Sequence, residues 1–126
     1  MTTVTPEEAK KIRAEKLKLA KYWMRETWPN LFSKEQKENP KPLMTHIDIK
    51  IIAEFKHQGG SEKLGFSARQ IRVYLSRWTG NASYLKNIIE GELRYNLDGE
   101  IAQPITEIQK KYAQEAIKYV VEYIKK

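Results

Sequence analysis

The sequence predicts a mainly α-helical single domain with one small β-hairpin. Its 126 residues are the length of one domain. Hydrophobic residues make up 40% of the chain and charged residues 31%, which is too apolar for a disordered protein. Apolar residues recur at helical spacing in several segments, and most of these segments open with a helix-capping signal. One Asp-Gly pair, Asp98-Gly99, is typical of a tight hairpin turn.

The first predicted helix begins after Thr5 and ends near Trp28. Thr5 is followed by Pro6 and two acidic residues, the usual order of a cap, a first-turn proline and charges that favour the positive helix end. Pro29 stops this helix. Its apolar residues are Ile12, Leu19 and Trp23, with Leu17, Met24 and Trp28 beside them. Its cationic face, which we interpret as solvated surface, carries Lys10, Lys11, Lys18, Lys21 and Arg25.

Residues 29–44 contain three prolines and many polar residues, and they predict a loop held by Leu31 and Phe32. Thr45 is then predicted to begin a second helix, with Asp48 as its capping partner. Gly59-Gly60 ends it. The apolar residues of this helix, which predict that it packs between others, are Ile47, Ile49, Ile51, Ile52 and Phe55. Its polar stripe consists of His46, Lys50 and His57.

A capping box formed by Ser67 and Gln70 is predicted to open a third helix, which Gly80 ends. The apolar residues at i, i+3, i+4 and i+7 predict its buried face, and they are Ile71, Tyr74, Leu75 and Trp78. A short fourth helix through Tyr84 and Leu85 follows.

The remaining chain predicts a hairpin and a long helix. Residues 92–96 alternate weakly before the Asp98-Gly99 turn. Thr106 with Gln109 then opens the last helix. Its apolar stripe is Ala113, Ile117, Val120 and Ile124, beside Tyr112, Tyr119 and Tyr123. This pattern reaches the final residues without a capping signal, which is typical of a fragment of a longer chain.

Several classes of protein are disfavoured by what the sequence lacks. There is no cysteine, which excludes a disulfide framework and a thiolate zinc site. No Walker loop, nucleophile elbow or dinucleotide fingerprint is present, and we expect neither enzymatic activity nor a cofactor. His46 and His57 are eleven residues apart on one helix, a rise of roughly 16 Å, which is too far for a shared metal. Without a bilayer-length apolar run or a signal sequence, we expect a cytoplasmic protein that does not bind membranes.

The charge balance raises the prospect of a nucleic-acid partner. Lys and Arg number 23 against 16 acidic residues, a formal net charge of +7. On the third helix, Arg69 and Arg72 lie opposite the apolar face, with Ser76 continuing their line. The first turn also presents free backbone N–H groups beside the Ser67 hydroxyl, where a phosphate fits. Arg69 there opposes the helix dipole, which is unfavourable unless an anion lies close by.

Five short motifs in order resemble the FinO/ProQ family of bacterial RNA chaperones, over about residues 23–117. Each motif alone is weak, but their common order and spacing are specific. They are Trp28-Pro29-Asn30-Leu31-Phe32, Pro42-Leu43, the segment LGFSARQIRVYL of residues 64–75, Ser83-Tyr84-Leu85 and Arg94-Tyr95-Asn96-Leu97-Asp98-Gly99. Residues 23–126 are thereby identified as the family's RNA-binding domain, and residues 1–22 as a basic amphipathic extension.

The resemblance implies a compact helical fold with a small β-hairpin and a concave, basic face for RNA. The ligand would be a terminator-like stem with its single-stranded 3′ tail, in small regulatory RNAs or transcripts, and the role post-transcriptional regulation. By position, Tyr84 and Arg94 match the family's concave pocket, and Arg72 matches a basic residue of the third helix. Tyr84 would stack on or hydrogen-bond the 3′ end, whereas by sequence alone it reads as a core tyrosine. Arg94 would hold a tail phosphate through two donors.

The sequence departs from the family pattern at four positions. Gly is common where His46 stands, basic residues where Ala68 and Ser76 stand, and Trp where Ala82 stands. Arg69 is expected to take the role vacated at Ala68. The complete set of expected RNA-binding residues is His46, Lys50, Ser67, Ala68, Arg69, Arg72, Tyr84 and Arg94.

Two other functions remain open at this point. A helical module could dock an acidic protein partner on its basic faces. A DNA-binding helix-turn-helix protein could use the helix after Ser67, although its wide apolar face leaves little room for base readout. Our prediction is an RNA-binding monomer.

Overall fold

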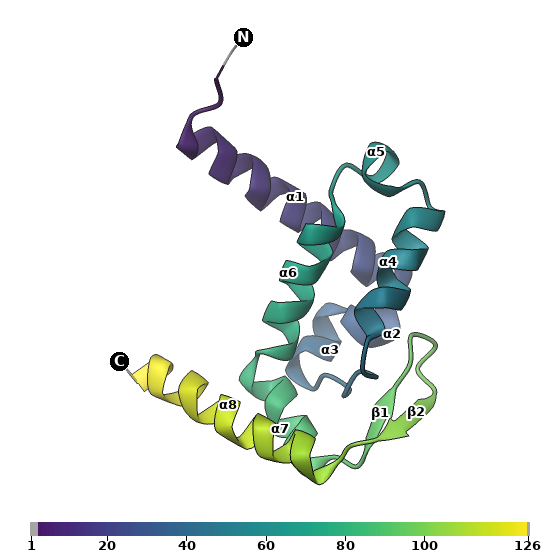
Figure 1. Ribbon diagram of the computed structural model, residues 1–126, viewed down its shortest axis with the longest axis vertical. Helices are drawn as coiled ribbons and strands as arrows, with labels where there is room; N and C mark the ends of the chain where they lie inside the picture. Colours follow the sequence, from purple (N-terminus) through teal and green to yellow (C-terminus); the bar gives the residue numbers. More distant parts are fainter. Residues whose placement is uncertain (1–2, 126) are drawn as a thin grey trace.

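A computed structural model describes residues 3–125 as eight helices and one two-stranded sheet (Figure 1). The mainly helical fold class is thereby confirmed. The elements are α1 (Pro6–Thr27), α2 (Pro29–Phe32), α3 (Lys34–Glu38), α4 (Ile47–His57), α5 (Gly60–Leu64), α6 (Ala68–Thr79), α7 (Ala82–Glu90), β1 (Leu93–Tyr95), β2 (Ile101–Pro104) and α8 (Glu107–Lys125).

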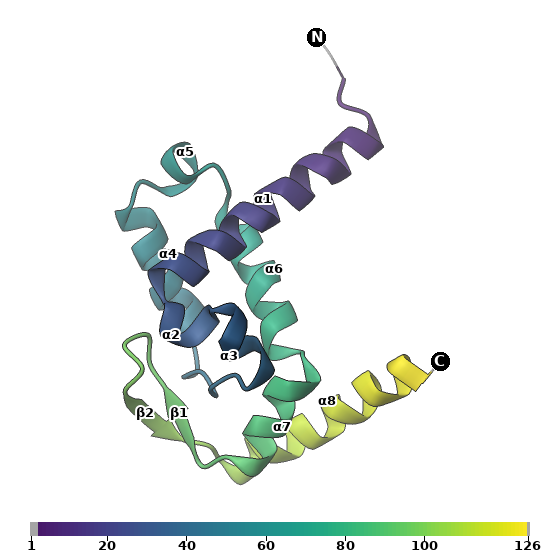
Figure 2. The same cartoon turned by 180° about the vertical axis from the view of Figure 1, so that it is seen from behind.

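The helix α6 runs through the middle of the molecule, with α1 and α4 packed against it. The sheet lies beside the start of α4, and α8 packs along α7. The outer halves of α1 and α8 extend to the same side of the molecule, as Figures 1 and 2 both show. No helix among residues 3–125 is long and apolar enough to cross a membrane.

One hydrophobic core joins these elements. Helix α6 buries the face predicted from its period, which consists of Ile71, Tyr74, Leu75 and Trp78. Aromatic rings of α1, α2, α4 and α6 contact one another at its centre, together with Phe66 from the segment between α5 and α6. Leu31 and Phe32 are buried, as predicted.

The first half of α1 lies outside this core. The helix has the predicted bounds and cap: the Thr5 hydroxyl accepts from the Glu8 N–H at 3.1 Å. The predicted apolar face is nevertheless wrong for Ile12 and Leu19, which are exposed. For Ile12 the reason is that no other element covers the outer half of α1. The helix runs without a break through residue 22.

Two short helices, α2 and α3, occupy the first part of the loop predicted for residues 29–44, whereas residues 39–44 are non-helical as predicted. Pro29 stands in the first turn of α2, and the Ser33 hydroxyl accepts from the Gln36 N–H at 3.4 Å to cap α3. Prolines mark helix starts as well as loops, which is why their number misled the prediction.

The start of α4 is also different from the prediction. Its N-cap is His46, in the left-handed conformation with a φ of 62°, and not Thr45. The Thr45 backbone N–H and hydroxyl instead both donate to the Gln103 side-chain oxygen at 3.1 Å. Ile49 is exposed, so α4 is open on one side. After Gly59, with a φ of 111°, the chain forms α5, which the sequence did not predict.

The helices predicted for the second half of the chain are present, with the predicted caps. Gln70 Oε1 accepts from the Ser67 backbone N–H at 2.8 Å, which closes the start of α6. Thr106 and Gln109 cap α8 reciprocally. The predicted fourth helix is α7. Along α8, Ala113 is buried and Tyr112 and Tyr119 are exposed. The side chains of Tyr123 and Ile124 lie outside the described part.

The hairpin is present and holds a third segment against it. Strands β1 and β2 pair antiparallel, and Gly99 takes a φ of 80° in the turn between them. Residues 42–44 lie along the other side of β1. The Tyr95 N–H donates to the Pro42 carbonyl at 2.8 Å, and the Met44 N–H donates to the Tyr95 carbonyl at 2.9 Å. This pairing places the chain that leads into α4 beside both β1 and α7.

Candidate functional site

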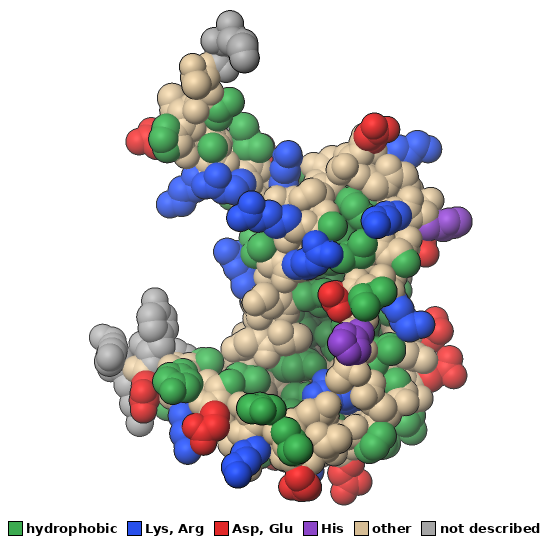
Figure 3. Space-filling model, in the orientation of Figure 1, with side chains coloured by type: hydrophobic (Ala, Val, Ile, Leu, Met, Phe, Trp, Pro, Cys, Tyr) green, Lys and Arg blue, Asp and Glu red, His purple; other side chains and the backbone are tan. Residues whose placement is uncertain are grey.

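A pocket of about 590 Å³ opens between the start of α4, the middle of α6, α7 and β1. We call it the concave pocket. In Figure 3 this face is hollowed, and histidine, Lys and Arg side chains gather around the hollow. Four of the residues expected from the sequence line the pocket, and they are His46, Arg72, Tyr84 and Arg94.

Arg94 lies on β1 and is held by two hydrogen bonds. One terminal nitrogen donates to the Leu43 carbonyl at 2.7 Å, and Nε donates to Gln109 Oε1 at 3.1 Å. A guanidinium has five N–H donors, so others remain for a ligand. Because the guanidinium is planar and always charged, two fixed bonds also fix the direction of the remaining donors.

Tyr84 lies on α7 with only 5% of its surface exposed. Its hydroxyl oxygen accepts from the Leu43 backbone N–H at 3.0 Å, which leaves its own proton to donate. Burial raises the pKa of this phenol, opposed by the Leu43 N–H and by the charge of Arg94. The hydroxyl is therefore a neutral donor at physiological pH. The buried ring leaves its hydroxyl, and not its face, for contact with a ligand.

Helix α6 supplies a polar side of the pocket through Arg72, Ser76 and Thr79. Arg72 is exposed, whereas the Thr79 hydroxyl donates to the Leu75 carbonyl at 2.9 Å. His46 and Asp48 lie at the opposite side, at the start of α4. The pocket thus combines two arginines with one carboxylate and several hydroxyl groups.

The other expected residues lie elsewhere. Ser67, Ala68 and Arg69 stand at the N-terminal end of α6, outside the pocket lining. The Ser67 hydroxyl contacts Gln70 Oε1 at 2.5 Å, within the helix cap. Lys50 does not line the concave pocket, because it lies in a separate groove between α4 and the hairpin, beside Trp28 and Leu97.

Sequence reasoning missed the two residues that hold the site together. Leu43 belongs to the Pro42-Leu43 motif, but it acts through its backbone N–H and carbonyl, a role that the motif does not indicate. Gln109 was interpreted only as the cap of the last helix, yet its side-chain oxygen accepts from both the Thr106 N–H and Arg94. Among residues 3–125, no group of three His, Asp or Glu side chains is placed to hold a metal ion.

Comparisons with known proteins agree with this fold. A family model described as ProQ/FINO family matches residues 14–126. The solution structure of a ProQ homolog from Legionella pneumophila is 25% identical with a TM-score of 0.66, covering 83% of this chain and 82% of that one. The crystal structure of a FinO-like RNA chaperone from Neisseria meningitidis has 17% identity and a TM-score of 0.63, covering 85% of each chain, and it supports the fold alone. No curated protein is significantly similar in sequence.

Proposed function

Since this chain belongs to the ProQ/FINO family, we propose that it is an RNA-binding chaperone whose concave pocket takes the 3′ end of its RNA. The ligand is the base of a terminator-like stem with the single-stranded tail beyond it. Stabilising such small regulatory RNAs or transcripts makes the protein a post-transcriptional regulator. Its family is one of RNA chaperones and not of enzymes.

The donor set of the concave pocket supports this proposal. A 3′-terminal ribose offers two adjacent hydroxyl groups, and the phosphate before it carries a negative charge. The free N–H groups of Arg94 suit that phosphate, because a guanidinium pairs with phosphate oxygens through parallel bonds. The Tyr84 proton and the Asp48 carboxylate suit the ribose hydroxyls, which can accept and donate. The hydrogen bond from the Leu43 N–H fixes the position of the Tyr84 hydroxyl in the pocket lining.

The exposed side of α6 supports a second contact, with the stem. Arg69 and Arg72 are both exposed on this helix, and Arg72 also lines the pocket. Duplex RNA hides its base edges in a deep major groove, so proteins hold its backbone and shape. A stem whose strand end enters the concave pocket would therefore lie along α6 from Arg72 toward Arg69 and the helix start at Ser67.

The same proposal covers the organisation of the chain. Residues 23–126 form the RNA-binding domain, and residues 1–22 a basic extension of α1 that adds electrostatic attraction. The protein acts in the cytoplasm. It acts as a monomer, a proposal supported by a pocket whose lining comes from one chain.

The main support for the proposed function is that Tyr84, Arg94 and Arg72 line one pocket. The test is the affinity of the protein for one hairpin in four forms: with a 3′-hydroxyl tail, with a 3′-phosphate tail, without a tail, and as duplex DNA. We expect the 3′-hydroxyl tail to bind at least about tenfold more tightly than the others, roughly 1.4 kcal/mol. Equal affinity for the 3′-hydroxyl and 3′-phosphate forms would contradict a pocket that takes the free terminus.

A further inference from the structure

A second pocket, of about 520 Å³, lies between α1, α3 and α6. We call it the α1–α6 pocket. It shares no lining residue with the concave pocket, because the two open on different faces of α6. Its lining contains five cationic side chains and no carboxylate, and the cations are Lys18, Lys21, Arg25, Lys37 and Arg77. The remaining wall is largely apolar, with Leu17, Pro40 and Trp78.

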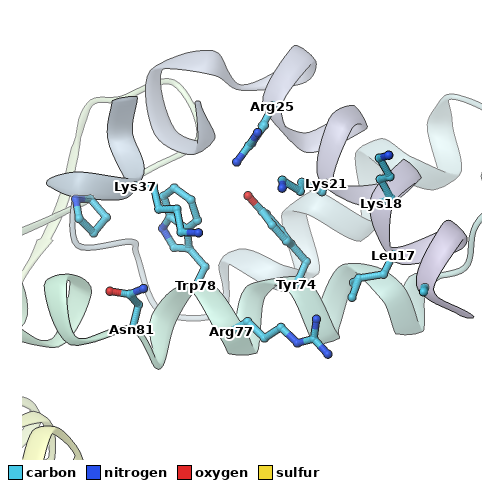
Figure 4. Close-up of a pocket in the computed structure, with 11 residues that line it drawn as sticks. Leu17, Lys18, Lys21, Arg25, Lys37, Tyr74, Arg77, Trp78 and Asn81 are labelled. Atoms are coloured by element: carbon cyan, nitrogen blue, oxygen red, sulfur yellow. The ribbon is translucent and has the colours of Figure 1, made fainter. Parts of the chain in front are cut away.

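Three buried donors in this lining have no hydrogen-bond partner. They are Arg25 Nε, the Tyr74 hydroxyl and Trp78 Nε1, and within the described part of the chain no other buried side-chain nitrogen or oxygen lacks one. Tyr74 and Trp78 are only 9% and 6% exposed. In Figure 4 the Tyr74 hydroxyl points toward Arg25 and Lys21 of α1. Arg25 lies close enough to the Tyr74 oxygen to lower the pKa of Tyr74, but Arg25 only donates, so none of the three groups has an acceptor. An unpaired buried polar group costs about 1–3 kcal/mol, so three such donors in one place indicate a missing acceptor.

No ion pair to a carboxylate holds any of the five cations that line this pocket, within the described part of the chain. The single ion pair found among the described residues joins Lys118 and Glu115 on α8, at 3.6 Å. The charge of Arg25 lowers the pKa of Lys21, with burial and then Lys37 adding to the effect. Glu35 of α3 does not line the pocket. Its own backbone N–H and the Ser33 hydroxyl are the main causes that lower the pKa of its carboxyl, and the charges of Lys34 and Arg25 contribute less.

The Tyr74 phenol adds a neutral donor to this charge. Burial raises its pKa, and the nearby Arg25 only partly opposes the rise. At neutral pH the hydroxyl therefore keeps its proton. Arg25 Nε and Trp78 Nε1 can only donate. A ligand that satisfies all three must supply acceptors and negative charge.

We propose that the α1–α6 pocket is a second binding site, which takes the phosphate group of a nucleotide. Phosphate oxygens are strong acceptors, and one phosphate can receive several charge-assisted hydrogen bonds at once. The pocket volume is within the range of small-molecule sites, and its apolar wall offers contact for a ribose or base. The nucleotide is either free or part of an RNA chain. This inference does not depend on the concave pocket.

Titration of the ¹⁵N-labelled protein with AMP tests the proposal, with the three tryptophan indole N–H signals as probes. The Trp78 signal is assigned by its loss in Trp78→Phe. The Trp23 indole donates to Gln58 Oε1 at 2.7 Å and serves as an internal reference. We expect AMP to shift the Trp78 signal saturably and leave Trp23 unchanged, and we expect adenosine, without phosphate, to shift neither. No saturable shift at roughly 10 mM AMP, or an equal shift with adenosine, would overturn the proposal.

Variants identify the residues that bind. Arg25→Gln should weaken AMP at least about tenfold, roughly 1.4 kcal/mol, and Lys37→Gln should weaken it severalfold. Lys37 is exposed, so its replacement leaves the fold intact. Lys11→Gln makes the same charge change on α1 outside the pocket and should bind AMP as the wild type does. If Arg25→Gln and Lys37→Gln both bind AMP with the affinity of Lys11→Gln, the α1–α6 pocket is not the binding site.

A tailed RNA hairpin distinguishes the source of the phosphate. If the hairpin shifts the Trp78 indole N–H signal, and AMP competes with it for the pocket, the ligand is an RNA phosphate. A hairpin that binds without shifting this indole identifies a free nucleotide. Both results support the second site. A hairpin that does not bind at all contradicts only the function proposed for the concave pocket.

Discussion

The Tyr84 hydroxyl and the Arg94 guanidinium are joined through one residue, Leu43. The Leu43 N–H donates to the Tyr84 oxygen at 3.0 Å, and the Leu43 carbonyl accepts from Arg94 at 2.7 Å. Leu43 itself is 2% exposed and forms an isolated bridge with Tyr95 of β1. The distance between the two donors is therefore set by a buried backbone segment, and not by either side chain alone.

Replacing Arg94 with Lys should lower RNA affinity although the charge is kept. A lysine has no planar set of donors that could bind Leu43 and Gln109 and still face a phosphate. We expect a loss of at least about tenfold for the tailed hairpin, roughly 1.4 kcal/mol, measured by fluorescence anisotropy. Lys86→Gln, on the exposed face of α7, is the matched control and should have little effect. Full affinity of Arg94→Lys would mean that charge alone suffices at this position.

Tyr84→Phe should affect both stability and the choice of RNA end. The variant keeps the ring but leaves the buried Leu43 N–H without an acceptor, which costs about 1–3 kcal/mol of the free energy of unfolding. The preference for a 3′-hydroxyl over a 3′-phosphate should also shrink. Urea denaturation measures the first effect, and the ratio of two affinities at a temperature where the variant is folded measures the second. An unchanged ratio of the two affinities would mean that Tyr84 has only a structural role in the core.

Local patterns predicted those elements whose determinants lie close together in sequence. The period of Ile71, Tyr74, Leu75 and Trp78 shows one buried face without knowledge of its partner. The cap formed by Thr106 and Gln109 spans three residues, and the hairpin turn needs only Asp98-Gly99. Such signals identify the buried face of a helix or the end of an element, but they do not show which other element packs against it. Ile12 has the right period and is nevertheless exposed, because α1 extends beyond the core.

Contacts between distant residues could not be predicted in this way. Thr45 bonds to Gln103, 58 residues away, and so begins the hairpin contact instead of a helix. Tyr84 and Arg94 are paired in the sequence only through the family resemblance, since the Pro42-Leu43 motif does not indicate that the Leu43 backbone joins them. The cationic face of the first helix was interpreted as solvated surface, whereas Lys18, Lys21 and Arg25 line a pocket whose other wall is α6.

Replacing His46 with Gly should leave the protein as stable or make it more stable. A side chain in the left-handed conformation costs about 1–2 kcal/mol, and glycine avoids this at an entropic cost of about 0.5–1 kcal/mol. The conformation also explains why the resemblance includes glycine at this position. His57→Gly, in the last turn of α4, is the control and should lower stability by about 1 kcal/mol. A larger loss for His46→Gly than for His57→Gly, in urea denaturation, would contradict this account.

Arg72 should contribute to binding through charge. If about four phosphates are neutralised, log K should fall with log salt at a slope of about −3 to −4. Arg72→Ala and Arg69→Ala should each weaken hairpins of different stem sequence by similar factors, on the order of 1 kcal/mol, and reduce the slope by about 1. Lys56→Ala, exposed at the far end of α4, is the control. A loss confined to one stem sequence would mean that these arginines read bases.

Alkaline pH should destabilise the fold through its buried phenols. Burial raises the pKa of Tyr74 and of Tyr84 above the ordinary value of 10.0, so the folded state retains these protons where the unfolded state releases them. Their contribution is therefore complete below pH 10.0 and is lost as the pH rises through the folded pKa. Each group can lower the free energy of unfolding by up to about 1.4 kcal/mol per pH unit in that window.

Comparison of variants isolates this effect from the titration of lysines, which all variants share. We expect the free energy of unfolding of Tyr74→Phe, from urea denaturation followed by circular dichroism, to fall less steeply between about pH 10 and 11 than that of the wild type. Tyr112→Phe removes a phenol that is 72% exposed and should follow the wild-type curve. Because Tyr74 also lines the α1–α6 pocket, saturating AMP should steepen the loss in the wild type, since the ligand binds only the protonated, donating phenol. Identical curves for the wild type and Tyr74→Phe would show that this hydroxyl is no less ionisable in the fold than in the unfolded chain.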